Sequence, residues 1–121
     1  MMLPPSPTFA TVRQLALALP EVTEGTSYGT PAFHVRGTLL ARLREDGTTL
    51  VIKAEPAERE ARIFANPAVF FVTDHYVGYP LLLVRLDAVA VADLRVLLAQ
   101  AWRLVAPKRL LRAADRANES P

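Results

Sequence analysis

The sequence contains no cysteine, and this excludes a disulfide framework, a thiolate metal site and a thiol nucleophile. Its only histidines are His34 and His75, and because no third soft ligand accompanies them we expect no zinc site, no other bound metal and no cofactor. Uncharged hydrophobic runs are too short to cross a membrane. The first residues also lack the basic start and the small-residue cleavage site of a secretion signal. We therefore expect a cytoplasmic protein without membrane contact.

Hydrophobic residues are abundant, at 51% of 121 residues, and this composition predicts a single folded domain over residues 1–121. The formal net charge is only +2, although most of the 14 basic residues are arginine. A guanidinium group matches the geometry of a phosphate, so this enrichment fits anion recognition. It also fits the codon usage of a GC-rich genome. Because alanine, leucine and proline are abundant too, composition alone favours codon usage as the explanation of the arginine enrichment. The positions of the charged residues along the chain are therefore more informative about function than their number.

Helical spacing and strand-like alternation divide the chain into short elements separated by turns. The pattern predicts helices over residues 7–19, 56–65, 94–105 and 108–117, and strands over residues 32–35, 38–44, 49–54, 69–73 and 81–87. Residues 21–31, which are rich in glycine and hydroxyl side chains, are predicted to form a loop. The resulting order, α-β-β-β-α-β-β-α-α, indicates an α+β fold in which one antiparallel sheet of about five strands is covered on one face by helices.

Alternation along the strands predicts which side chains face the helices. A two-residue turn at Asp46-Gly47 pairs Leu43 with Leu50 and Arg42 with Val51, and cross-strand partners share a face. The core side then receives Leu39, Ala41, Leu43, Leu50, Ile52, Ala54, Leu82, Val84 and Leu86. The opposite, open face receives Leu40, Val51, Leu81, Leu83, Arg42, Arg44, Lys53 and Arg85, with Asp87 as its one acidic residue. Polar residues are ordinary on an open sheet face, but charges of one sign also suit a binding surface.

The facing of His34 depends on the turn that follows it. A three-residue turn over residues 35–37 places His34 on the open face, whereas a two-residue turn directs it inward.

Four runs of sequence, taken together, resemble one known family. They are EGTSYGTPAF at residues 24–33, LLARLRED at residues 39–46, FFVT, HY and GYP between residues 70 and 80, and AW with PK between residues 101 and 108. In their order and spacing these runs resemble the MmcQ/YjbR family of small bacterial proteins, over about residues 17–110. Residues 1–6 and 113–121 fall outside the resemblance and are expected to be peripheral.

The resemblance implies a frataxin (CyaY)-like α+β fold and a DNA-binding protein whose β-hairpins form a double wing. It does not extend to iron binding, because the first helix contains no Asp or Glu and only Glu21 and Glu24 follow it. Ala90 stands where a polar helix cap is expected, a departure that concerns stability.

The chemistry-bearing residues match no catalytic arrangement. Ser27 is the only serine outside the termini, and its neighbours do not resemble a nucleophile elbow. Asp74 and His75 are adjacent in the chain, so in an extended segment they point to opposite sides. The segment from Gly25 to Gly29 leads into a strand rather than a helix, which does not fit a phosphate-binding loop. We therefore expect no enzymatic activity.

Non-enzymatic DNA binding, mainly through phosphates, is the function that we expect from these features. The candidate contacts are Arg36, Arg42, Arg44, Lys53, Arg85, Lys108, Arg109 and Arg112. The alternative is a protein-interaction or small-ligand-binding module that uses the open sheet face and a loop carrying Tyr76 and Tyr79. These two rings could stack on bases, or they could simply pack the loop against the core. DNA and a protein partner both remain open at this point.

Overall fold

The computed structural model describes residues 6–119; residues 1–5 and 120–121, which include most of the predicted peripheral N-terminal segment and the end of the tail, lie outside the described residues. In chain order the elements are α1 (Phe9–Leu17), β1 (Val22–Ser27), β2 (Thr30–Val35), β3 (Thr38–Leu43), β4 (Thr49–Lys53), α2 (Pro56–Ala65), β5 (Phe70–Phe71), β6 (Leu81–Arg85), α3 (Val91–Val105) and α4 (Lys108–Glu119). The α+β class and the single antiparallel sheet are confirmed, with six strands instead of about five.

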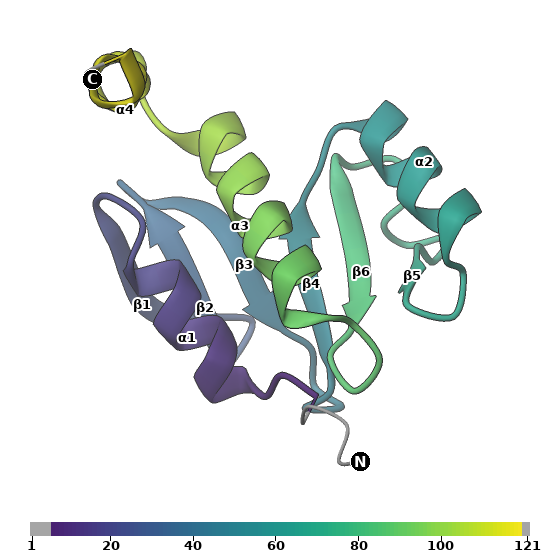
Figure 1. Cartoon of the computed structure of the whole chain (residues 1–121). Helices are drawn as coiled ribbons and strands as arrows, with labels where there is room; N and C mark the ends of the chain where they lie inside the picture. Colours follow the sequence, from purple (N-terminus) through teal and green to yellow (C-terminus); the bar gives the residue numbers. More distant parts are fainter. Residues whose placement is uncertain (1–5, 120–121) are drawn as a thin grey trace, which may run out of the picture.

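The sheet has the strand order β1-β2-β3-β4-β6-β5, and every neighbouring pair is antiparallel. Figure 1 shows α1 and α3 side by side across one face, where α1 packs against β1 and α3 against β3 and β4. α2 packs against β5 and β6 at the other edge, and α4 follows α3 beyond the end of the sheet. Within residues 6–119 no helix has both the length and the apolar character needed to span a membrane.

The face under the helices carries the main hydrophobic core. Leu50, Ile52, Leu82 and Val84 are fully buried there, as their alternation predicts. The predicted register between β3 and β4 is also confirmed, with Leu43 opposite Leu50. Because burying an aliphatic side chain contributes about 1.5–3 kcal/mol, these positions together determine which face of the sheet turns toward the helices.

The segment predicted to be a loop, residues 21–31, contains β1 and the start of β2, and that prediction was wrong. The sequence of β1 shows no alternation of hydrophobic and polar residues, because Val22 is the only buried residue of this strand. Its position is fixed by pairing with β2, where Val22 lies opposite Val35. Arg13 of α1 adds a two-pronged ion pair, donating to both carboxylate oxygens of Glu24 over 2.8 and 3.0 Å. β1 therefore forms through tertiary contacts and has no hydrophobic periodicity of its own.

Two tight turns flank β2 and carry bulky side chains where small ones are usual. Tyr28 and Gly29 connect β1 to β2, Arg36 and Gly37 connect β2 to β3, and all four residues have positive φ. Two successive positive φ values define a type I′ turn, which prefers Asn, Asp or Gly at its first position. Tyr28, at φ 53°, and Arg36, at φ 49°, therefore hold strained backbone conformations.

A β-bulge between β2 and β3 changes the facing predicted for three residues. The pairing shifts between Phe33 and His34, whose partners are Ala41 and Leu39, so Leu40 is the extra residue. Leu40 is fully buried in the main core while Leu39 lies on the opposite face, which reverses the prediction for both. His34 pairs with Leu39 and shares its face, although the following turn has only two residues.

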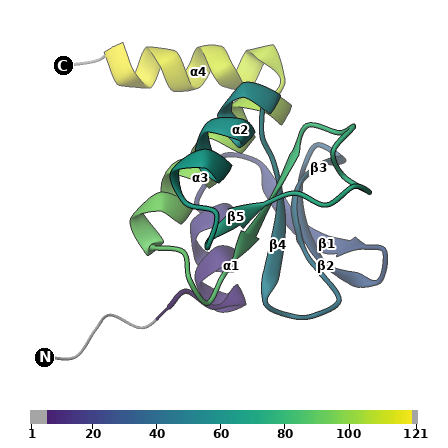
Figure 2. The same ribbon diagram turned by 90° about the vertical axis from the view of Figure 1, so that its right-hand side faces the viewer.

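The other face of the sheet is crossed by the β5–β6 loop, residues 72–80, as Figure 2 shows. Val51, Leu81 and Leu83 lie on this face, and Phe71 and Tyr76 pack on them in a second, smaller hydrophobic cluster. The face predicted to be open is therefore covered over parts of β4 and β6.

Candidate nucleic-acid interface and aromatic groove

Arg42 was predicted to contact phosphates from the open face, but its side chain is buried and the residue is only 5% exposed. Its Nη2 donates a hydrogen bond to the Tyr76 hydroxyl over 2.6 Å, and its Nη1 lies 3.4 Å from both Thr30 Oγ1 and a Glu45 carboxylate oxygen. The guanidinium carbon also lies 5.3 Å from the centre of the Tyr28 ring. Arg42 thus points to the predicted face, but its guanidinium is engaged within the protein and is too buried to reach a DNA backbone.

A second buried arginine, Arg59 of α2, holds the far end of the same loop. Its Nη1 donates to the carbonyl oxygen of Tyr79 over 2.8 Å and lies 3.4 Å from that of Leu81. Together with the bond from Arg42 to Tyr76, this contact fixes the β5–β6 loop at two points. The Tyr79 backbone is therefore anchored while the residue remains 59% exposed.

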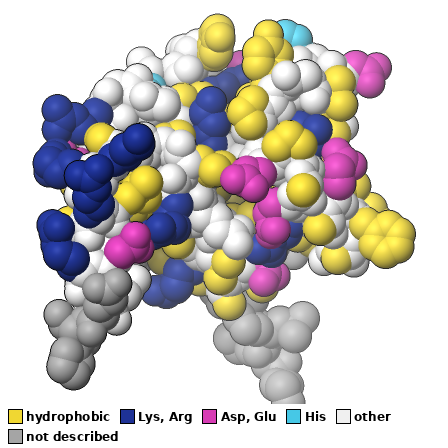
Figure 3. All heavy atoms as spheres, turned by 90° about the horizontal axis from the view of Figure 1, so that it is seen from above, with side chains coloured by type: hydrophobic (Ala, Val, Ile, Leu, Met, Phe, Trp, Pro, Cys, Tyr) yellow, Lys and Arg dark blue, Asp and Glu magenta, His cyan; other side chains and the backbone are white. Residues whose placement is uncertain are grey.

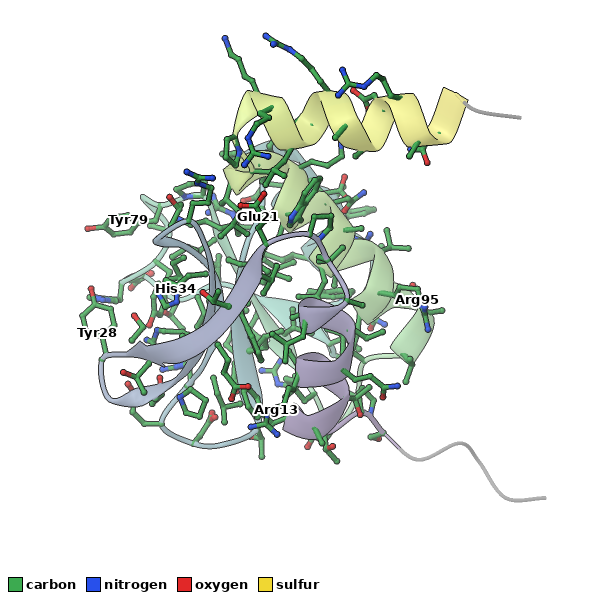
Figure 4. All side chains as sticks on the ribbon, turned by 90° about the vertical axis from the view of Figure 1, so that its left-hand side faces the viewer. Arg13, Glu21, Tyr28, His34, Tyr79 and Arg95 are labelled. Atoms are coloured by element: carbon green, nitrogen blue, oxygen red, sulfur yellow. The ribbon has the colours of Figure 1, made fainter. Side chains whose placement is uncertain are left out.

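Between this loop and the turn at Tyr28 lies a groove of about 510 Å³, which we call the open-face groove. It is lined by Tyr28, Leu39, Arg42, Glu45, Val51, His75, Tyr76, Tyr79 and Leu81. All three tyrosines of the chain line it. Figure 4 shows Tyr28 and Tyr79 projecting from the same side of the molecule, away from α1 and from Arg95. The predicted ligand-loop residues, Tyr76 and Tyr79, thus lie at the same groove as Tyr28. From the sequence, Tyr28 was placed in a predicted loop and no function was assigned to it.

The other three basic residues predicted for the sheet face lie apart from this groove. Arg44 and Arg85 both neighbour Thr49 across the strands, at the end of the sheet where β3 turns into β4. The Arg85 guanidinium lies 4.0 Å from the centre of the Phe71 ring, and its Nη1 is buried without a hydrogen-bond partner among the described residues. Lys53 borders a different cavity, of about 250 Å³, between α2 and α3. The predicted set of sheet-face cations therefore does not form one patch.

The remaining predicted contacts do gather, and we call them the basic ridge: Arg36, Lys108, Arg109 and Arg112. All four residues are exposed. Figure 3, which looks onto the end of the molecule where α4 lies, shows Lys and Arg side chains concentrated on one side. α4 presents this charge outward because its apolar residues, including Leu110, pack against the core.

Glu21 connects the two parts of the basic ridge. One of its carboxylate oxygens accepts a hydrogen bond from Arg109 over 2.9 Å, and the other accepts one from Arg36 over 3.3 Å. The hydrogen bond from Arg109 is the largest influence that holds the pKa of Glu21 below its ordinary value, so the carboxylate is charged at neutral pH. One carboxylate between two guanidinium groups leaves positive charge in excess. Within residues 6–119, neither Lys108 nor Arg112 forms an ion pair.

The two surfaces offer different chemistry. The basic ridge presents charged hydrogen-bond donors suited to phosphate oxygens. The open-face groove presents aromatic ring faces beside an apolar floor. In the part of the chain that the structure describes, no three His, Asp or Glu side chains lie together in a way that could hold a metal ion.

Comparison with known proteins supports the family resemblance. The family model described as YjbR matches residues 17–104. The chain belongs to the YjbR family. Uncharacterized proteins of Mycobacterium bovis (Mb2600) and Mycobacterium tuberculosis (MT2646 and Rv2570) are each 47% identical to it over 53 residues, which are 44% of this chain and 41% of theirs. The match therefore spans less than half the length of these relatives.

A solved structure shares the fold of this YjbR-family chain. The crystal structure of Deinococcus radiodurans protein DR2400, described with the family-model domain DUF419, aligns with a TM-score of 0.75 over 99% of this chain and 94% of that one, at 23% sequence identity. The YjbR match contains every residue that lines the open-face groove, whereas α4 begins beyond it at Lys108. The basic ridge is therefore built mostly from residues outside the family match.

Proposed function

We propose that this YjbR-family chain is a non-enzymatic DNA-binding protein that contacts the phosphate backbone, and that the basic ridge is its contact surface. The observation that supports the proposal is the gathering of four exposed cations at one end of the molecule. Such a cluster attracts a polyanion, and binding is driven by the release of condensed counterions. Contacts of this kind position a protein on DNA without reading its sequence.

The arrangement of the basic ridge suits phosphate contacts. Lys108 and Arg112 stand four residues apart on α4, so their side chains project from the same side of the helix. Arg36 and Arg109 are held by Glu21, which reduces the conformational freedom that their side chains lose on binding. Their guanidinium groups retain further donors that can form paired hydrogen bonds with phosphate oxygens.

Arg44 and Arg85 are secondary candidates for phosphate contact. They share the end of the sheet beside Thr49, and both are partly exposed. Arg42 is not part of the proposed surface because it is buried, and Lys53 borders the cavity next to α3.

The test is the salt dependence of binding to a short DNA duplex of mixed sequence, followed by fluorescence anisotropy. With four phosphates neutralised, the slope of log K against log salt concentration should be about −3 to −4. Replacing Lys108→Gln together with Arg112→Gln should weaken binding and make the slope shallower by about two. The matched control is Arg95→Gln, because Arg95 is exposed on α3 on the side away from the open-face groove and outside the basic ridge (Figure 4).

Two results would contradict the proposal. One is the absence of duplex binding even at low salt. The other is a loss of log affinity in Arg95→Gln, which removes one positive charge, that is half the loss in the double variant, which removes two; equal losses per charge would show that net charge alone drives the association and that the basic ridge has no special part in it.

A further inference from the structure

We propose that the open-face groove binds an unpaired nucleobase, so that a single strand of nucleic acid, rather than a duplex, engages both the groove and the basic ridge. This inference rests on the proposed function, since the basic ridge supplies the phosphate contacts. It adds a second site and names the chemical group that the site accepts.

The aromatic rim of the groove is the first argument. Every tyrosine of the chain is at this site, and they come from two separate segments, the β1–β2 turn and the β5–β6 loop. Tyr76 has a structural task, because it packs on the second hydrophobic cluster and bonds to Arg42. Tyr28 and Tyr79 are 85% and 59% exposed, so most of the surface of each residue faces solvent. Exposed rings that flank a groove are the side chains on which unpaired bases stack.

The conformation of Tyr28 is the second argument. It occupies the first position of a type I′ turn at φ 53°, where Asn, Asp or Gly would be free of strain. A bulky ring at such a position carries a backbone cost that folding does not require, and strain of this kind collects at binding sites. The Arg42 guanidinium, 5.3 Å from the ring centre, holds the ring beside the groove.

The floor and the charges of the groove favour a neutral, flat group. Leu39, Val51 and Leu81 provide an apolar floor, and the volume of about 510 Å³ lies within the range of small-molecule sites. Arg42 is occupied by contacts inside the protein, and the Glu45 side chain is 65% exposed beside it. A carboxylate at this position repels a phosphate but accepts hydrogen bonds from the amino groups of a base. We therefore assign the base to the groove and the phosphates to the basic ridge.

The experiment compares three ligands of equal length: a single strand of mixed sequence, the same strand with abasic sites in place of its bases, and the corresponding duplex. The groove variants are Tyr28→Asn and Tyr79→Ala, and the matched control is Phe64→Ala. Asn is the favoured residue at the strained turn position, so Tyr28→Asn removes the ring without a cost to the turn. Phe64 is an aromatic residue of α2 that is 92% exposed and does not line the groove.

We expect the single strand to bind more tightly than either the abasic strand or the duplex. Each groove variant should weaken single-strand binding by about fivefold or more, as loss of one base-stacking contact does, and should leave duplex binding unchanged. Phe64→Ala should change neither affinity. Circular dichroism and thermal unfolding of each variant confirm that the fold is retained.

Several outcomes would overturn the inference. If abasic and natural strands bind equally, or if Tyr28→Asn and Tyr79→Ala bind the single strand as the wild type does, the groove holds no base. If a nucleoside monophosphate quenches tyrosine fluorescence while strand binding remains indifferent to bases, the base comes from a free nucleotide and the strand assignment is wrong. Duplex binding that persists in these cases leaves the proposed function standing, whereas loss of all binding in the wild type refutes both.

Discussion

Arg42 and Tyr76, 34 residues apart in the chain, are joined by a 2.6 Å hydrogen bond from the guanidinium to the phenolic oxygen. The bond ties β3 to the β5–β6 loop above the second hydrophobic cluster. Its donor is charged and shielded from water, so it contributes more than a neutral, exposed hydrogen bond would. The shape of the open-face groove therefore depends on an interaction inside the protein, and the residue predicted to bind DNA instead supports the groove.

Removing the acceptor of this bond should destabilise the fold. Tyr76→Phe keeps the ring in its apolar cluster but leaves a buried guanidinium nitrogen without that partner, so the free energy of unfolding should fall by about 1.5–3 kcal/mol. Urea denaturation followed by the fluorescence of the single tryptophan, Trp102, measures the change. The control is Tyr79→Phe at an exposed position, which should shift stability by no more than about 0.5 kcal/mol. Equal effects of the two substitutions would contradict the assignment.

The turn at Arg36 and Gly37 should be more stable with glycine at its second position than with a residue that carries a side chain. Gly37 has φ +83° and no heavy atom within 4 Å of an added Cβ, so Gly37→Ala should cost only backbone strain, about 1–2 kcal/mol. Gly78→Ala is the matched control, since Gly78 also has open space around it but lies outside the positive-φ region. The free energy of unfolding of Gly78→Ala should stay level or rise slightly, because alanine lowers the conformational entropy of the unfolded chain. Thermal unfolding distinguishes the two, and a neutral Gly37→Ala would argue against the type I′ turn.

Glu21 should titrate below 4.5, the ordinary pKa of a glutamate, chiefly because Arg109 donates a hydrogen bond to it. A lowered pKa means that the charged form stabilises the folded state, so this contribution is complete above pH 4.5 and is lost as the pH falls through the folded-state pKa. The midpoint is measured from the NMR shift of the Glu21 carboxyl carbon. Arg109→Gln should raise it toward the ordinary value, whereas Arg95→Gln should leave it in place. If the titration midpoint of Glu21 is the same in Arg109→Gln as in the wild type, Arg109 of α4 does not contact this carboxylate.

The sequence predicts this fold well where hydrophobic pattern and local signals agree. α2 begins at Pro56 and ends at Ala65 as predicted, and the register of β3 with β4 follows from the Asp46-Gly47 turn. β1 was missed because an edge strand with one buried residue leaves no alternation to detect. The reversal of Leu39 and Leu40 comes from a β-bulge, which strict alternation does not anticipate.

The sequence predicts the candidate site less well than the fold, because the contacts that shape the site join residues far apart in the chain. Arg42 faces the predicted side, but its burial is caused by a loop that crosses the sheet. Arg59 was passed over because nothing in its helix indicates a bond to the carbonyl of Tyr79. Each residue of the basic ridge was predicted as a DNA contact. The hydrogen bond from Arg109 to Glu21, which lies 88 residues earlier in the chain, was not predicted.

Arg85 offers a final test, because its Nη1 is buried with no hydrogen-bond partner among the described residues. Such a nitrogen lowers stability, since its desolvation is not compensated. Arg85→Met keeps a long apolar side chain beside the Phe71 ring, on which the guanidinium now rests at 4.0 Å, and removes the unpaired donor. We expect the free energy of unfolding to stay within about 0.5 kcal/mol of the wild type or to rise.

The same variant reports on DNA binding. Arg85 lies outside the basic ridge, so duplex affinity should fall far less in Arg85→Met than in the double substitution of Lys108 and Arg112. A loss of more than about 1 kcal/mol of stability on urea denaturation would instead mean that stacking on Phe71 outweighs the unpaired donor. A fall in affinity equal to that of the ridge variant would move the phosphate contacts to the end of the sheet beside Thr49, which Arg44 and Arg85 share.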